Sequence, residues 1–145
     1  MQSNDSFLAL SAALTGFSTL DLLGTGMAQE YQRTLDATLP PGIYRELLET
    51  WASAGGGEAA TDQIMGDPKL GPVARNLIQL WYCGTWSAMP DDWRSAYGTT
   101  PLDMSRVVSP EAFQAGLQWA VAGAHAPASG QQGFAAWALP PEGSS

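Results

Sequence analysis

Apolar residues recur at the spacing of an α-helix through most of this 145-residue chain, and glycine and proline divide them into short segments. The clearest segment has Tyr44, Leu47, Leu48 and Trp51 at positions i, i+3, i+4 and i+7. We find no convincing alternation of apolar and polar residues, no hairpin signal and no internal repeat. The pattern predicts a single-domain, all-α fold: an irregular bundle of about five helices.

Local start and stop signals give these helices their expected ranges. We expect helices over Ser3–Thr15, over Thr19–Thr38, between Pro40 and the triglycine at Gly55, over Glu58–Met65, from Gly71 to Trp81 or Tyr82, and from Ser109 through Val121. Gly24 and Gly26 fall inside the second range. A glycine inside a helix is unfavourable, so their presence suggests either close approach of another backbone or a helix that starts later.

Two stretches lack a helical pattern. Residues 87–108 are rich in turn formers such as Pro90 and Gly98, and a long irregular loop of this kind is commonly functional. Residues 123–145 are rich in Ala, Gly, Pro and Ser, and we expect them to form a long extended C-terminal arm beyond a helical domain of residues 1–122. Phe134 and Trp137 on this arm are expected to dock on a partner; the alternative is that the arm folds back over the bundle.

Charge restricts the partners of this chain. It carries 14 acidic and 6 basic residues, a net charge of −8, and the bases form no cluster. Nucleic acid and anionic membrane surfaces both require a basic patch, so we expect neither as a partner. No run of about 18 apolar residues is present, so no direct membrane span is expected.

The low share of charged residues points to a protein partner. Charged residues make up 14% of the chain and hydrophobic residues 45%, with six Trp. A surface with so few charges is expected to be hidden in part against another protein, where Trp is enriched. The alternative is that each Trp simply fills the core.

Residues able to carry chemistry are few. His125 is the single histidine, so neither a catalytic triad nor a two-histidine metal site can be built from this chain. Asp91 and Asp92 are expected to cap a turn. Cys83 is expected to be a buried, inert thiol; an intersubunit disulfide or a reactive nucleophile are the alternatives. Nucleotide, haem and serine-hydrolase motifs are absent, so we expect no catalytic, cofactor-binding or metal-binding residue here.

Several short motifs follow one another in an order that resembles a known family. They are Phe7-Leu8-Ala9-Leu10-Ser11 with Leu14-Thr15-Gly16-Phe17 and Leu20-Asp21, then Trp81-Tyr82-x-Gly84, then Phe113-x-x-x-Leu117-x-Trp119, and finally Gly133-Phe134-x-x-Trp137-Ala138. In this order they resemble the small subunits of membrane-bound, FAD-dependent sugar and polyol dehydrogenases, such as those for sorbitol, fructose and glucose.

The resemblance implies a non-catalytic role in a periplasmic complex. In that family a large flavoprotein subunit oxidises the sugar with FAD, and a multihaem cytochrome c subunit often passes electrons to the membrane. The small subunit helps the large one mature and carries it through the twin-arginine export route. This sequence departs from the family in lacking a twin-arginine signal, so we expect that the signal has been removed from it.

The aromatic stretches and the motifs together predict a partner interface. It comprises Trp81, Tyr82, Gly84, Trp86, Trp119, Phe134 and Trp137. Two other functions stay open: a stand-alone helical enzyme or ligand-binding domain with an aromatic pocket around Trp81, Trp86 and Trp119, and a helical interaction module unrelated to dehydrogenases.

Overall fold

A central helix, α6 (Leu70–Cys83), organises the computed structural model, which describes residues 2–122. The other elements in that range are α1 (Gln2–Thr15), α2 (Thr19–Gly24), α3 (Ala28–Thr38), α4 (Ile43–Ser53), α5 (Gly57–Met65), β1 (Thr85–Trp86), α7 (Asp91–Tyr97), β2 (Arg106–Val107), α8 (Pro110–Gln114) and α9 (Leu117–Ala122). Five helices in this part of the chain have nine or more residues, so the predicted, mostly helical fold is confirmed. The predicted arm lies outside the described residues.

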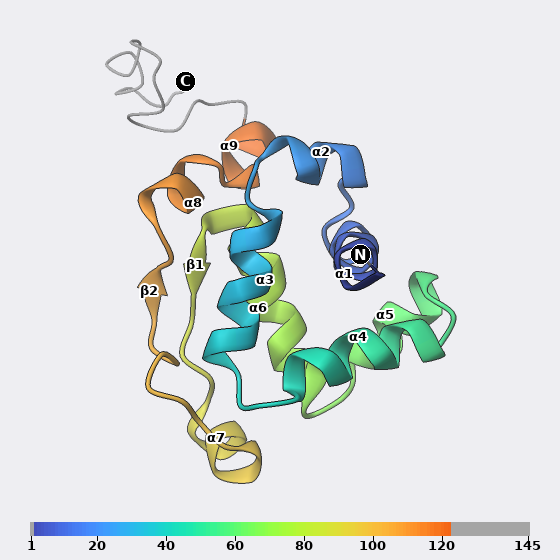
Figure 1. Ribbon diagram of the computed structural model, residues 1–145, viewed down its shortest axis with the longest axis vertical. Helices are drawn as coiled ribbons and strands as arrows, with labels where there is room; N and C mark the ends of the chain where they lie inside the picture. The colour runs from blue at the N-terminus through green and yellow to red at the C-terminus, as the bar shows by residue number, and fades with distance from the viewer. Residues whose placement is uncertain (1, 123–145) are drawn as a thin grey trace.

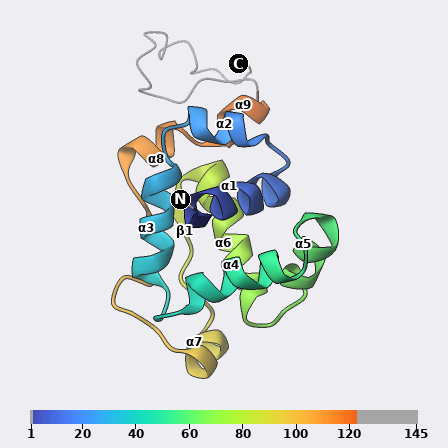
Figure 2. The same cartoon turned by 45° about the vertical axis from the view of Figure 1, so that its right-hand side comes forward.

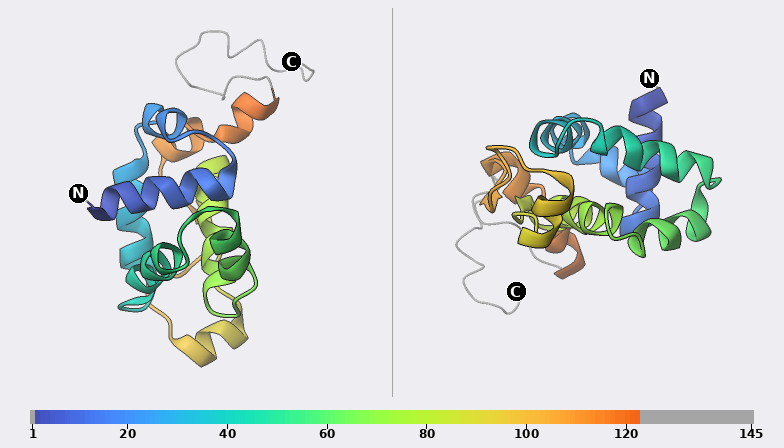
Figure 3. Two further views of the ribbon diagram at one scale, coloured as in Figure 1. Left: turned by 90° about the vertical axis from the view of Figure 1, so that its right-hand side faces the viewer. Right: turned by 90° about the horizontal axis from the view of Figure 1, so that it is seen from below.

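The core forms where α6 is covered by its neighbours. It packs against α1, α3, α5, α8, α9 and β1, and Figure 3 shows α1 running across α3 and α6. Trp81 of α6 is fully buried, with Phe7 of α1 and Tyr31 of α3 at ring-centroid distances of 6.0 and 4.9 Å. Aromatic pairs in such tilted and edge-to-face arrangements add to the stabilisation from buried area.

The helix predicted over Thr19–Thr38 is in fact two helices, and this prediction is wrong. α2 ends at Gly24 and α3 begins at Ala28, because Gly26 adopts a left-handed φ of +76° between them. The Thr25 hydroxyl donates to the carbonyl of Leu22 and accepts from the Met27 amide, which fixes the turn. A Cβ placed on Gly24 or Gly26 would meet no atom within 4 Å, so the suggested close approach of a backbone is wrong, and the two glycines instead lie where α2 ends and before α3 begins.

The stretch 87–108, expected to be irregular, contains ordered elements. α7 occupies Asp91–Tyr97, with Asp91 and Asp92 in its first turn, and β2 pairs antiparallel with β1. Figure 1 shows β2 on the outer side of β1 and α7 at the end of the molecule. Helix α7 has seven residues and each strand two, so neither is long enough to produce a recognisable periodicity.

The last predicted helix also divides in two. The Ser109 side chain accepts from the Ala112 amide at 3.0 Å, which confirms the expected N-cap of α8. α8 then stops at Gln114, and α9 starts at Leu117 after Gly116. A Cβ on Gly116 would lie 2.6 Å from the carbonyl oxygen of Tyr82, so this position admits only glycine as the chain crosses the end of α6.

Gly84 makes the corresponding contact from the α6 side. Its φ of +71° ends α6, and a Cβ there would lie 2.4 Å from the backbone carbonyl atoms of Ala112 in α8. Two glycines therefore bring α6 into backbone contact with the segment that forms α8 and α9.

We predict that Gly84→Ala lowers the free energy of unfolding by at least about 3 kcal/mol, since a left-handed alanine and an overlap with fixed backbone act together. The matched control is Gly26→Ala, which has the same sign of φ but open space around it, and should cost only about 1–2 kcal/mol. Urea unfolding measures both, and equal losses would show that the contact with α8 has no energetic importance.

Candidate partner-binding surface

Three residues predicted to touch a partner lie in the interior instead: Gly84, which is buried against the backbone of Ala112, and the two residues Trp81 and Trp86. Trp81 and Trp86 are each 1% exposed and pack among buried side chains. Their rings face the interior of this chain, and a partner on its surface would not reach them. The aromatic pocket proposed around them is likewise filled by core side chains.

The other predicted residues within the described range lie near the end of α6. Tyr82 is half-buried, donates its hydroxyl to the Thr15 carbonyl at 3.1 Å and packs edge-on against Phe17. Trp119 is half-buried and donates its indole N–H to the carbonyl of Phe113 at 2.9 Å. These contacts hold α1, α6, α8 and α9 together, and they leave part of each ring accessible. Phe134, Trp137 and His125 lie outside the described residues.

Cys83 is the last residue of α6 and is a free thiol. Its sulfur lies 3.9 Å from the side-chain oxygen of Gln118, and the residue is only partly buried. The prediction of a largely buried thiol is therefore too strong.

Among the described residues that are buried, Asp103 is the charged one, and it is 3% exposed. Its carboxylate accepts from the indole N–H of Trp86 at 2.9 Å and from the amide of Met89 at 3.0 Å. It also pairs with Arg94 of α7 at 3.1 Å, and Arg94 donates a second bond to the Asp103 carbonyl. One buried carboxylate thus joins β1, α7 and the segment that precedes β2.

The segment around Asp103 exposes apolar side chains. Leu102, Met104 and Val107 are about half exposed, and Leu20 and Leu23 of α2 form a second exposed apolar pair. Sequence reasoning did not single out Leu102, Met104 or Val107, and it named Leu20 only as part of a motif, because exposure of an apolar side chain has no local sequence signal. A single exposed Leu needs no explanation, but several on one short segment are a candidate contact surface.

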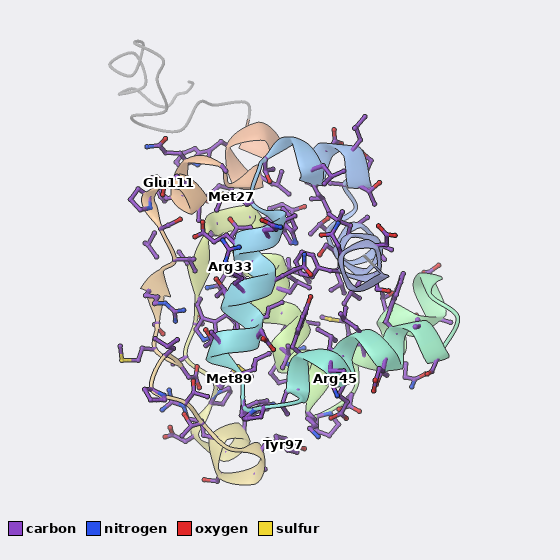
Figure 4. The ribbon with its side chains drawn as sticks, in the orientation of Figure 1. Met27, Arg33, Arg45, Met89, Tyr97 and Glu111 are labelled. Atoms are coloured by element: carbon purple, nitrogen blue, oxygen red, sulfur yellow. The ribbon has the colours of Figure 1, made fainter. Side chains whose placement is uncertain are left out.

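A groove between α1, α3 and α4 is the other notable surface feature, with a volume of about 610 Å³. Arg33 and Arg45, labelled in Figure 4, line it together with Asp36 and Glu49. Charges of both signs therefore line this open groove, and they favour no single class of ligand.

Within residues 2–122 no three His, Cys, Asp or Glu side chains gather closely enough to hold a metal ion. In the same range no helix is both long and apolar enough to cross a bilayer.

Burial perturbs one titratable group in the core. The pKa of Tyr31 is raised above its ordinary value, mainly because burial disfavours the phenolate, with smaller contributions from Glu30 and Cys83. Its hydroxyl has no hydrogen-bond partner in the part of the chain that the structure describes. The ring of Tyr31 therefore stabilises the core by packing, while burial of its hydroxyl costs free energy that no hydrogen bond within the described residues offsets.

Comparison of this chain with protein-family models, with curated proteins and with solved structures found no match.

We predict that Asp103→Ala lowers the free energy of unfolding by about 3 kcal/mol, because the buried N–H groups of Trp86 and Met89 lose their acceptor. Asp92→Ala is the control, since this exposed carboxylate bonds only the adjacent Trp93 amide, and it should cost less than about 1 kcal/mol. Chemical denaturation followed by Trp fluorescence measures both. Similar losses for the two variants would contradict the role assigned to Asp103.

For Tyr31→Phe we predict a free energy of unfolding at pH 7 equal to or above that of the wild type, because the hydroxyl that is removed makes no hydrogen bond among the described residues. The raised folded-state pKa means that the unfolded chain releases the proton first, so the wild type loses stability as pH rises above about 10. The variant should lose about 1 kcal/mol less per pH unit there. Tyr82→Phe, which removes the bond to Thr15, should instead cost about 1 kcal/mol at pH 7. The prediction fails if the two variants behave alike.

Proposed function

We propose that this chain is the non-catalytic small subunit of a periplasmic, FAD-dependent sugar or polyol dehydrogenase, and that it stabilises the large flavoprotein subunit during maturation and export. The observation that carries the proposal is the ordered set of motifs that resembles this family of small subunits. FAD belongs to the large subunit in this proposal, and a multihaem cytochrome c completes the complex.

The packing of the motif residues supports the resemblance. Phe7 of the first motif group packs on Trp81 of the central motif, and Phe17 packs on Tyr82 at 5.9 Å. Phe113 and Trp119 of the third motif stack edge-on at 5.5 Å. Residues far apart in sequence thus form one framework around the end of α6, as expected of motifs that preserve a fold.

The arrangement of polar groups supports a non-catalytic role. Asp103 is the buried carboxylate of this region, and its hydrogen bonds join β1, α7 and the segment before β2. The exposed apolar side chains of Leu102, Met104 and Val107 offer contact area to a protein instead. An interaction module unrelated to dehydrogenases would share these surfaces, and only the identity of the partner separates the two functions.

Co-expression tests the proposal. The proposal expects an adjacent reading frame to encode a flavoprotein with an FAD-binding motif. That flavoprotein should co-purify with this chain in equal amounts, with flavin on the large subunit only. Without this chain the flavoprotein should reach the periplasm, and gain sugar-oxidising activity, at a small fraction of its normal yield. A flavin spectrum in stoichiometric amount on the isolated chain would refute the proposal, and so would normal maturation of the flavoprotein without it.

A further inference from the structure

The burial pattern is inverted in the segment that precedes β2. Asp103 is 3% exposed, while its neighbours Leu102 and Met104 are 49% and 59% exposed. A segment that covers a core normally turns its apolar side chains inward and its acids outward. Here the charged side chain supplies internal hydrogen bonds and the apolar side chains face outward.

This exposed segment is held rigidly. Beside the bonds of Asp103, the Arg106 guanidinium donates to the carbonyls of Leu102 and Met104 at 2.6 and 3.2 Å and to the Thr38 hydroxyl at 3.2 Å. The Ser105 hydroxyl accepts from the amide of Ala88 at 2.9 Å. Leu102 and Met104 therefore lie on a backbone that is fixed to α3 and β1. Binding of a partner to them requires little further ordering of this segment, so little conformational entropy is lost there.

The strand β2 also has an open edge. Thr85 lies opposite Val107 in the ladder, and the Val108 amide donates to the Gly84 carbonyl at 2.9 Å. Bonded and non-bonded pairs alternate along an antiparallel ladder, so Thr85–Val107 is a non-bonded pair. The N–H and C=O of Val107 consequently point away from β1, on the outer side of the sheet (Figure 1). Unpaired strand edges of this kind recruit another extended segment.

The charges of residues 93–110 and the exposed apolar area beside β2 indicate what kind of segment binds at this edge. Residues 93–110 contain one acid, Asp103, which is buried and paired with Arg94, and a second base, Arg106, whose guanidinium donates to carbonyl and hydroxyl oxygens. Exposed acids flank the segment at Asp91, Asp92 and Glu111, so the positive charge that it offers is that of Arg106. It accepts an apolar segment that places an acidic residue beside Arg106. The three side chains are each about half exposed and together offer at most about a few hundred Å², well below the roughly 800 Å² per partner that a stable dimer needs. The area favours a short strand of a larger protein that also makes contacts elsewhere, over a second copy of this chain.

We propose that the open edge of β2, with Leu102, Met104 and Val107, receives an extended apolar strand of the large flavoprotein subunit, which adds to β2 as a third strand. The inference rests on the proposed function, because it takes that flavoprotein as the partner. Main-chain bonds to Val107 provide affinity, and the pattern of side chains on Leu102 and Met104 provides selectivity.

The test measures binding of the full chain to the flavoprotein encoded in the adjacent reading frame. Val107→Pro removes the outward N–H, and the double variant Leu102→Ser/Met104→Ser removes the apolar surface while leaving the backbone unchanged. Each should weaken binding at least about tenfold. The matched control is Leu20→Ser/Leu23→Ser on α2, which lies with α9 at another part of the molecule (Figure 2) and should bind like the wild type. Circular dichroism checks that each variant is folded.

The outcomes separate this inference from the proposed function. Wild-type binding with no loss in the folded double variant would overturn the docking site and leave the proposed function intact. A loss in the α2 control equal to that of the double variant would overturn it too. Failure of the wild-type chain to bind the flavoprotein would refute the proposed function and this inference with it. A wild-type dimer that the double variant converts to monomer would assign the edge to a second copy.

Discussion

The fold depends on the burial of α6 around Trp81. This helix is covered by α1, α3 and α5 and by the elements that follow it, so most of its buried side chains are apolar or small, with Asn76 the polar exception. Trp81 fills the space between Phe7 and Tyr31, and in doing so sets the positions of the first and third helices. Gly84 then allows α8 to approach the end of α6. The two halves of the described chain meet at these positions.

A second constraint acts on the segment after α6. Among residues 99–108 only Val108 packs against the apolar core, and polar bonds hold the rest: Asp103 to Trp86 and Arg94, and Arg106 to Thr38 (Figure 4 shows Met89 and Tyr97 at this end of the molecule). A polar anchor leaves the neighbouring apolar side chains free to face outward. The internal hydrogen bonds of Asp103 and the exposure of Leu102 and Met104 thus follow from the same backbone conformation, which turns the acid inward and the apolar side chains outward.

Local signals in the sequence predict the helices and some of their ends. The i, i+3, i+4, i+7 pattern predicts α4, and Ser109 predicts the start of α8, because both depend only on nearby residues. Pairing of β1 with β2 and the bond from Trp86 to Asp103 depend on residues 17 or more positions apart and have no such signal. Composition could not separate core from interface aromatics, which is why Trp81 and Trp86 were expected at the surface. The exposure of Leu102 and Met104 follows from the burial of Asp103, which no motif indicated.

The central claim is that this chain binds the flavoprotein through a preformed edge. Amide hydrogen exchange, compared between the free chain and its complex with that flavoprotein, tests it most directly. The account predicts that protection gained on binding is greatest over residues 99–108 and includes the Val107 amide, whose exchange is fast in the free chain because it faces away from β1. A complex in which Val107 exchanges as fast as in the free chain, with protection gained only elsewhere, would contradict it.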